Sequence, residues 1–485
     1  MSRPNLLFVL ADQFRAMCLD APGDGGDPVS TPSLDGLVAQ GTSLRHAVSN
    51  YPVCSPHRAM LMTGQYPHQN HVTHNVNSLT ASWGVGLRAD APSWVRVLRD
   101  AGYRTGYIGK WHLQAPVPED AVHGEGILED GRYWDAYSPP ECRHGFDYWY
   151  SYGCCDQHLT PHYWTGDAPR EQRIDVQGWS AAHETDVAIG FLDDGVPDDG
   201  GAPNNRAPFA LVVSYNPPHQ PFDQLPEGWD QSYGDLPAEA LLPRPNVDLD
   251  GGAGREAAEI APLYYAAVAA IDAQVGRLLD ALADRGLAQD TIVVFTSDHG
   301  QQMGSHQQLY KNVPYEESMR IPFALRWPGR IPTGPNPTVL SSVDTGPTLL
   351  GLMGLADSIP TAMQGANLAA SLLDPGAADA DAGALYFRYP HDAAGAPSLR
   401  GFRTATWKIV ASHSPGTGTG SGSGSGTSVE CFDLDADPYE LHPIIGGPAT
   451  AARVTRLAAE LAAAGDDWAG LPGLRQLAAA EPAAP

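Results

Sequence analysis

Polar residues that could do chemistry follow directly after four apolar stretches of the chain. Residues 5–11 lead into Asp12 and Gln13. The other three stretches are residues 104–108, leading into Lys110 and His112, residues 209–215, leading into His219, and residues 291–296, leading into Asp298 and His299. In an open α/β sheet the carboxyl ends of the strands share one edge, where ligands bind. Two carboxylates and three histidines at that edge predict an active site rather than four unrelated loops.

A further segment, residues 54–58, combines a thiol with a cation. Pro56 suits the first turn of a helix, so Cys54 is expected at a helix N-terminus, where unpaired N–H groups stabilise negative charge. Arg58 follows four residues later, unlike the longer spacing of cysteine phosphatase loops, and no local protease signature surrounds the thiol. A nucleophilic thiolate and an inert buried cysteine therefore both remain open from the motif alone.

The elements that must position these residues alternate between helix and strand. Apolar side chains recur every three or four positions over 92–101 and from 262 to Gly286, which predicts two amphipathic helices. Each helix is followed by an apolar strand, at 104–108 and 291–296. This order predicts an α/β fold with a large, mostly parallel sheet sandwiched between helices.

The pattern changes after about residue 375. Stretches 385–389, 403–412 and 429–434 read as strands without helices between them, which predicts a small antiparallel sheet. Two helices are expected to accompany it, over 453–464 and in the final Ala-rich segment. We therefore predict a catalytic domain over 1–375 and a C-terminal subdomain over 376–485, with a flexible Gly/Ser tract at 416–426.

Composition limits the partners of the protein. Its 485 residues carry a formal net charge of −27, which argues against nucleic acid and anionic membrane surfaces. No apolar run is long enough to span a membrane, and residues 5–11 are too short for a secretory signal. Because the six cysteines form no disulfide framework, we expect a cytoplasmic location.

Taken in order along the chain, these motifs resemble the type I sulfatases of the alkaline phosphatase superfamily. Residues 54–58 followed by Thr63-Gly64 are similar to the sulfatase signature, in which the cysteine is oxidised to formylglycine. The resemblance covers nearly the whole chain and includes Asp12-Gln13 and residues 109–112, 217–221, 297–300, 310–311, 432–434 and 437–438. It implies an alkaline phosphatase-like fold and a sulfuric ester hydrolase that cleaves a small aryl or carbohydrate sulfate.

The resemblance also implies the cofactors. Formylglycine forms a geminal diol, of which one hydroxyl attacks sulfur and the second later expels sulfate. A formylglycine-generating enzyme would install the aldehyde during maturation. One divalent cation is expected, Ca²⁺ first with Mn²⁺ or Mg²⁺ as alternatives. Its implied ligands are Asp12, Gln13, Cys54, Asp298 and His299.

The remaining roles come from the same resemblance. Arg58 would hold formylglycine, while Lys110 and Lys311 would clamp the sulfate oxygens. His219 would act as general acid to the leaving oxygen and His112 as the base for the second hydroxyl. Asp298 is also placed to accept the proton of the attacking hydroxyl.

The substrate is only weakly encoded. Inserts at 70–91 and 117–175 are expected to form its pocket, and the candidate substrate contacts are His57, His74, Asn75, Asp156 and His158. The net charge favours a small or end-exposed ester over the interior of a long sulfated chain. Two alternatives stay open: a phosphonate monoester or phosphodiester hydrolase on the same scaffold, and a non-catalytic binding protein with unmodified Cys54.

Overall fold

A ten-stranded mixed sheet forms the centre of the molecule. The computed structural model describes residues 3–20, 25–120, 131–193, 207–229, 233–390, 397–414 and 426–479. The strands lie in the order β10-β2-β9-β8-β1-β7-β3-β4-β5-β6. Their bounds are β1 Asn5–Ala11, β2 Thr42–Val48, β3 Arg104–Lys110, β4 Tyr148–Tyr152, β5 His162–Thr165, β6 Ile174–Asp175, β7 Phe209–Tyr215, β8 Thr291–Ser297, β9 Phe323–Arg326 and β10 Gly334–Ser341.

The central strands β8, β1, β7, β3 and β4 run parallel to one another. Outside this group, β9 pairs antiparallel with β8, β5 with β4, and β6 with β5. The predicted α/β class is therefore confirmed, with antiparallel strands added outside the central group. The helices of this part are α1 Pro32–Ala39, α2 Cys54–Thr63, α3 Pro67–Asn70, α4 Ser78–Ala81, α5 Trp94–Asp100, α6 Ser180–Asp193, α7 Ala238–Leu241, α8 Gly252–Asp284, α9 Glu316–Met319, α10 Ser342–Leu352 and α11 Ala369–Leu373.

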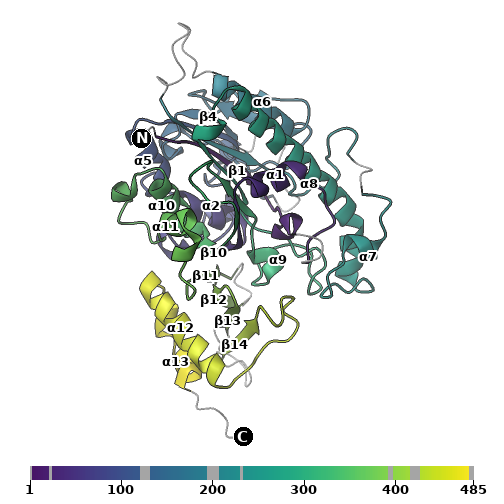
Figure 1. Ribbon diagram of the computed structural model, residues 1–485, viewed down its shortest axis with the longest axis vertical. Coiled ribbons are helices and arrows are strands. Elements are labelled where there is room, and N and C mark those ends of the chain that lie inside the picture. The colour runs from purple at the N-terminus through teal and green to yellow at the C-terminus, as the bar shows by residue number, and fades with distance from the viewer. Residues whose placement is uncertain are drawn as a thin grey trace.

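Both faces of the sheet are covered by helices, as β1 demonstrates. Leu6, Phe8 and Leu10 belong to one hydrophobic core, together with residues of α2, α5 and α10. The intervening Leu7 and Val9 belong to a second core, together with residues of α1, α6 and α8. In Figure 1 these two helix groups lie on opposite sides of the central strands. Burial on both faces explains why β1 is an uninterrupted apolar run rather than an alternating one.

The longest helix begins earlier than the sequence predicts. We expected a helix from residue 262, but α8 starts at Gly252, so Pro262 lies inside it. The helix thus begins almost three turns earlier than expected, and the fully buried Ala257 and Ala261 continue its apolar stripe ahead of Pro262. Their packing outweighs the hydrogen bond that the proline removes.

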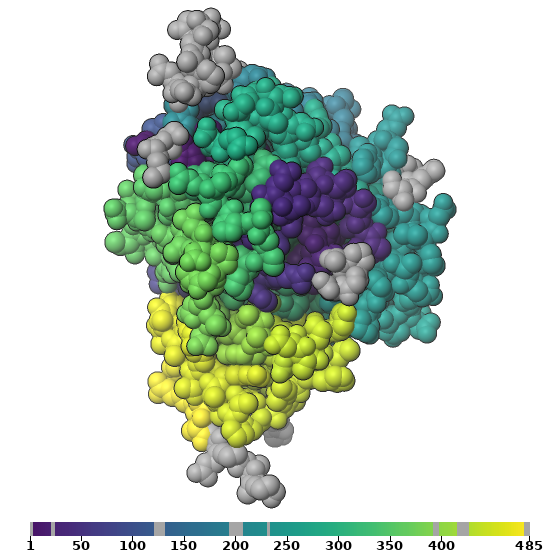
Figure 2. All heavy atoms as spheres, viewed as in Figure 1, coloured from purple at the N-terminus to yellow at the C-terminus, as the bar shows by residue number. Residues whose placement is uncertain are grey.

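A second, four-stranded antiparallel sheet follows, as predicted. It contains β11 Gly383–Arg388, β12 Ser398–Thr404, β13 Trp407–Ser414 and β14 Gly426–Asp433, and α12 Pro448–Ala464 and α13 Pro472–Ala479 accompany it. Figure 2 shows this C-terminal part as a lobe at one end of the molecule. The tract at 416–426 lies outside the described residues, except for Gly426.

The single strand expected over 403–412 is wrong. The chain turns between Thr404 and Trp407, because the Thr404 hydroxyl accepts hydrogen bonds from the backbone N–H groups of Thr406 and Trp407 at 3.4 and 3.2 Å. This side-chain turn separates β12 from β13 and lets them pair as a hairpin.

A buried ion cluster joins the two sheets. Glu316, at the start of α9, accepts hydrogen bonds from Arg403 Nη2 at 2.8 Å and from Lys408 Nζ at 3.2 Å. Both cations lie on the second sheet, and all three side chains are at least nine-tenths buried. The cluster therefore fixes the C-terminal sheet to a helix that starts five residues after Lys311.

Among the described residues, no helix is both long and apolar enough to cross a membrane. All six cysteines are free thiols, in agreement with the predicted lack of a disulfide framework. The cytoplasmic location stays a prediction.

Candidate active site

The register of the central strands brings the polar residues to one place. Ala11, the last residue of β1, pairs with Tyr215 of β7 on one side and with Ser297 of β8 on the other. The next residues along these three strands are Asp12, Asn216 and Asp298. The N-terminus of α2, with Cys54, lies over the same edge, and the end of β3 supplies Lys110. Sequence reasoning predicted this convergence from the strand ends alone.

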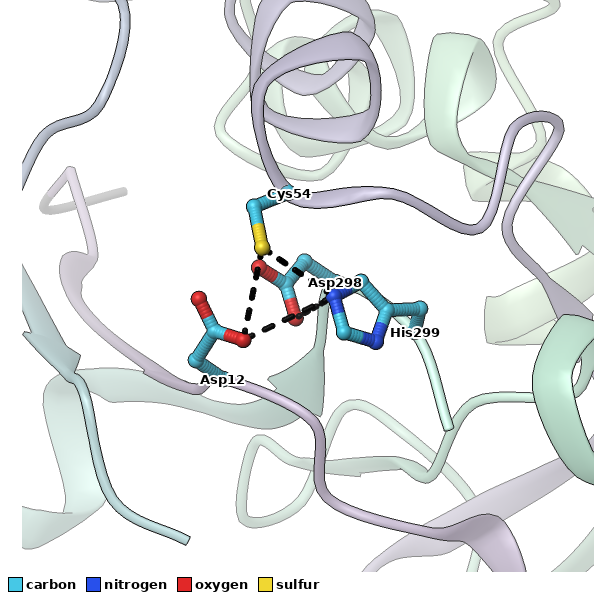
Figure 3. Close-up of side chains that lie close together, drawn as sticks. All are labelled: Asp12, Cys54, Asp298 and His299. Atoms are coloured by element: carbon cyan, nitrogen blue, oxygen red, sulfur yellow. Dashed lines mark hydrogen bonds and ion pairs between the residues drawn. The ribbon is translucent and has the colours of Figure 1, made fainter. Parts of the chain in front are cut away.

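Asp12, Cys54, Asp298 and His299 form a compact group of metal-binding side chains. Each offers one ligand atom, all four atoms lie within 4.8 Å of one another, and all four residues are buried. Figure 3 shows their side chains pointing toward a common centre. Carboxylates, a sulfur and an imidazole gathered in this way match the donors that divalent cations take in proteins.

The hydrogen bonds of His299 show which of its nitrogens can bind a metal. Nδ1 donates to the Gly300 carbonyl at 2.9 Å, so the lone pair lies on Nε2. Nε2 is 3.5 Å from Asp12 Oδ1, 3.6 Å from Asp298 Oδ1 and 3.3 Å from Cys54 Sγ. Burial lowers the pKa of His299 despite the neighbouring carboxylates, so the imidazole is neutral. The two carboxylate oxygens and Nε2 thus face one another with lone pairs, and the thiol of Cys54 is the one donor among the four atoms of this group. Such a gathering of electron pairs fits a bound cation.

The side chain of Gln13 is engaged outside this group. Its Oε1 accepts from Lys311 Nζ at 2.5 Å, and its Nε2 donates to Gln301 Oε1 at 2.5 Å and to Gln220 Oε1 at 3.1 Å. Its backbone N–H donates to Asp298 Oδ1 at 3.1 Å. The predicted role of Gln13 as a metal ligand would fall to Oε1, one lone pair of which already accepts from the Lys311 ammonium.

Arg58 is the central cation of the site. Its Nε donates to Asp298 Oδ2 and its Nη2 to Asp12 Oδ2, both at 3.1 Å. Its Nη1 donates to the Lys110 carbonyl and to the Ser214 hydroxyl, both at 2.8 Å. Burial alone would lower the pKa of Arg58, but the two carboxylates raise it. The guanidinium therefore fixes the outer oxygens of both carboxylates and leaves the inner ones for the metal group.

Lys110 is completely buried against Asp12. Its Nζ lies 2.7 Å from Asp12 Oδ2 and donates to Asn216 Oδ1 at 2.9 Å. Burial opposes both charges, yet their attraction holds the pKa of Lys110 well above and that of Asp12 well below its usual value. Both groups therefore stay charged at neutral pH, and the ammonium is ready to face an anion.

The pKa values of His112 and His219 are shifted in opposite directions. His112 Nε2 donates to the Val76 carbonyl at 3.1 Å, which leaves the lone pair on a buried Nδ1 without a hydrogen-bond partner. Burial, followed by Lys110 and Arg58, lowers the pKa of His112 well below its usual value. Burial and both lysines also act to lower the pKa of His219, but Asp156 and Asp12 raise it overall. The two pKa shifts thus favour a neutral His112, suited to act as a base, and a protonated His219, suited to act as an acid.

The candidate substrate contacts lie in different surroundings. His57 Nδ1 is 2.8 Å from the Ser49 hydroxyl and 3.0 Å from that of Ser342, so this buried ring of α2 is held by the residue that follows β2 and by the first residue of α10. His74 Nε2 donates to the Pro390 carbonyl at 2.7 Å. Asn75 Oδ1 accepts from the backbone N–H of Ser55 at 2.9 Å, which satisfies a donor in the first turn of α2.

The other two candidates lie beside His219. Asp156 Oδ1 is 3.4 Å from His219 Nδ1, and His158 Nε2 donates to the His219 carbonyl at 2.9 Å. Sequence reasoning missed Ser214 and Asn216, which contact Arg58 and Lys110. The position of Asn216, directly after β7, was the signal that could have revealed it.

The fold is of the alkaline phosphatase-like α/β class, and its site gathers four side chains of the types that bind divalent cations. The sulfatase family model matches residues 4–355, and the model of the C-terminal part of N-sulphoglucosamine sulphohydrolase matches residues 304–467. The chain therefore belongs to the sulfatase family and is a sulfuric ester hydrolase.

Similar proteins agree with this assignment. An endo-4-O-sulfatase of Bacteroides thetaiotaomicron is 40% identical over 462 residues, which cover 90% of this chain and 87% of the relative. A ulvan-active sulfatase of Formosa agariphila is 32% identical and covers 92% of this chain and 78% of the relative. A solved structure from work on the metabolism of multiple glycosaminoglycans by Bacteroides thetaiotaomicron has a TM-score of 0.86 and 35% identity, over 99% of this chain and 100% of that chain.

Proposed function

We propose that this sulfatase hydrolyses the sulfate ester of a carbohydrate, with formylglycine at position 54 and one divalent cation. The observation that carries the proposal is the position of Cys54, whose Sγ lies 3.3 Å from His299 Nε2 and 3.7 Å from Asp12 Oδ1. A nucleophile made from this side chain would contact the cation directly. The carbohydrate class is supported by the names of the relatives, an endo-4-O-sulfatase and a ulvan-active sulfatase.

Asp12, Asp298 and His299 would hold the cation, and their oxygen-rich donor set favours Ca²⁺. The cation and the aldehyde-derived diol together supply a polarised sulfate oxygen and a nucleophile that can later release sulfate. Arg58 keeps the two carboxylates in place through their outer oxygens. The metal group is therefore pre-organised by the chain itself.

The lysines bind the sulfate oxygens. The Lys110 ammonium is held in place by its contacts with Asp12 and Asn216. Lys311 is held by Gln13 Oε1 through a hydrogen bond that a sulfate oxygen can replace. Two ammonium groups around one anion stabilise the negative charge that shifts onto the sulfate oxygens as the ester bond breaks.

The two histidines move the protons. The raised pKa of His219 favours the protonated ring, which donates its proton to the departing sugar oxygen. His112 holds a lone pair on Nδ1 and accepts the proton of the remaining hydroxyl at residue 54, which permits sulfate release. The opposite directions of their pKa shifts match these opposite tasks.

The test begins with protein produced together with a formylglycine-generating enzyme. Mass spectrometry of the peptide that contains residue 54 is expected to find the aldehyde in place of the thiol. Protein in which the Cys54 thiol has become the aldehyde should hydrolyse the substrate. The Cys54→Ala variant should not, and its melting temperature should be unchanged. A Cys54 thiol that is never converted would instead support the non-catalytic alternative.

Substrate class is tested on the converted enzyme. Sulfated sugars, including a 4-O-sulfated disaccharide and longer oligosaccharides, are compared with an aryl sulfate and an aryl phosphonate monoester. We expect the highest kcat/KM with a sugar sulfate. A preference for the phosphonate would favour the phosphonate monoester hydrolase alternative, and comparing the oligosaccharide lengths separates a small or end-exposed ester from an internal one.

A further inference from the structure

The hydrogen bonds of His219 leave one nitrogen for catalysis. Its Nδ1 donates to the Gln220 carbonyl at 2.8 Å and lies 3.4 Å from Asp156 Oδ1. Because a carbonyl only accepts, Nδ1 carries a hydrogen in every protonation state that keeps this bond. The proton that the ring can gain or lose is therefore the one on Nε2.

Asp156 is itself held by a buried amide. Asn216 Nδ2 donates to Asp156 Oδ1 at 3.1 Å and to the Cys155 carbonyl at 2.9 Å. The opposite end of this amide accepts from Lys110 Nζ at 2.9 Å, and Asn216 is completely buried. Since lysine can only donate, it fixes which end of the Asn216 amide faces Asp156.

These contacts form a continuous polar chain from the sulfate-binding lysine to the general acid. It runs from Lys110 to Asn216, from Asn216 to Asp156 and from Asp156 to His219. The segment that carries Asp156 also contacts the backbone of His219, because His158 Nε2 donates to the His219 carbonyl at 2.9 Å. The segment 155–158 thus holds both the side chain and the backbone of His219.

We infer that Asp156 and Asn216 are positioning residues for His219, rather than Asp156 being a contact of the substrate. This inference rests on the proposed function of His219 as general acid. As the ester S–O bond breaks, its electron pair stays on the sugar oxygen, which takes the proton from His219 Nε2. The Asp156 carboxylate stabilises the imidazolium before this transfer, and Asn216 fixes where that carboxylate lies.

Other charges also face the His219 ring. Lys110 from β3 and Lys311 disfavour the imidazolium, whereas Asp12, the residue after β1, favours it. His158 lies two residues after Asp156. Asp12 is already paired with Lys110 and Arg58. The Asp156 side chain is 42% exposed and, in the described part of the chain, its side-chain contacts are with Asn216 and His219. Asp156 is therefore the carboxylate dedicated to this histidine.

The test compares Asp156→Asn with the wild type on two substrates at several pH values. The variant keeps the shape of the side chain and removes its charge, so the pKa of His219 should fall. We expect the basic limb of kcat/KM to move to lower pH. For a sugar sulfate, whose alkoxide leaving group needs the proton, kcat should fall by about 10- to 100-fold, since general acids contribute on the order of 10²–10⁴-fold. For 4-nitrophenyl sulfate, a good leaving group, kcat should change little.

Three further variants sharpen the test. Asp156→Glu, which restores the charge, should recover part of the lost kcat, and Asn216→Ala should shift the pH profile in the same direction as Asp156→Asn. Asp167→Asn is the matched control from the same insert, because its side chain is 95% exposed, and it should leave both substrates unaffected. Formylglycine content and melting temperature are measured for every variant, so that a folding or maturation defect is recognised.

An equal rise in KM for both substrates, with the basic limb unmoved, would show that Asp156 binds substrate and would overturn the inference. If the pH profile of kcat/KM in Asn216→Ala equals that of the wild type, Asn216 is not a positioning residue for His219. Absence of turnover by formylglycine-containing wild type on every sulfate ester would instead contradict the proposed function, and the inference with it.

Discussion

Arg58 Nε donates to Asp298 Oδ2 over 3.1 Å, although the two residues lie 240 positions apart in the chain. Both side chains are almost completely shielded from water. The bond ties the first turns of α2 to the end of β8, and a second bond from Arg58 reaches Asp12 at the end of β1. One guanidinium thus connects the three segments that carry the metal group.

Arg58→Met should destabilise the protein strongly. The methionine keeps much of the volume but leaves two buried carboxylates without their shared cation, at a cost of about 3–5 kcal/mol. Urea unfolding in the presence of a chelator measures the change in the free energy of unfolding. Arg58→Lys keeps the charge but loses the forked geometry, so its free energy of unfolding should lie between those of Arg58→Met and the wild type. Equal stability of Arg58→Met and wild type would contradict this role.

Addition of a divalent cation should raise the melting temperature of the chelator-treated protein. A ligand that binds only the folded state stabilises by about 2.7 kcal/mol at a concentration 100 times its Kd. Ca²⁺, Mn²⁺ and Mg²⁺ are titrated in turn with thermal unfolding as the readout. Asp298→Asn should weaken the effect, whereas Asp290→Asn, an exposed site at the opposite end of β8, should preserve it. No shift with any of the three ions would argue against the metal group.

Because of His57, the free energy of unfolding of the protein should depend on pH. Burial lowers the pKa of His57 to about 3, whereas an unfolded histidine has a pKa of about 6.5. Between these values the unfolded state binds a proton that the folded state does not. The free energy of unfolding should therefore fall as the pH decreases from about 6.5 toward 3.

Asn at position 57 offers an oxygen to Ser49 and Ser342 without titrating, so His57→Asn should show a weaker pH dependence. Urea unfolding at pH 7.5 and pH 5 compares the two proteins. A difference between the two pH values as large in the variant as in the wild type would assign the acid sensitivity elsewhere.

Glu184→Gln should stabilise the protein, and more so at higher pH. Glu184 lies on α6, is fully buried, and accepts a hydrogen bond from Tyr163 Oη at 3.0 Å. Burial raises its pKa well above the usual value, so the folded state keeps a proton that the unfolded state loses above about pH 4.3. Wild-type stability should decrease as the pH rises through this window. Thermal unfolding of both proteins at pH 5 and pH 8 tests this, and a variant that is less stable at pH 8 would indicate a charged Glu184.

The sequence predicted that the polar strand ends share one edge of the sheet, but it misplaced some local boundaries, for physical reasons. The bounds of β1 and β7 follow from continuous apolar runs, and the polar residues after them mark the functional edge of the sheet. Proline favours the first turn of a helix, so the sequence predicts a helix that begins at Pro262. The alanines before it are helical because they are buried in the folded protein, which no local sequence pattern encodes.

The roles of individual side chains depend on such distant contacts too. The sequence could not show that Gln13 holds Lys311 or that Asp156 lies beside His219, since each pair is far apart along the chain. His57 looked like a pocket residue from its place in the signature, yet its partners Ser49 and Ser342 come from other elements.

The ion cluster of Glu316, Arg403 and Lys408 bears on how such chains can be recombined. A cut after the first sheet would leave Glu316 buried without its cations and would loosen the segment that carries Lys311. The C-terminal family model begins at residue 304, ahead of that lysine, although the second sheet starts only at Gly383. In a chimera between two sulfatases, α9 and the second sheet should therefore come from the same parent protein. The junction should lie before residue 304 rather than between the two sheets.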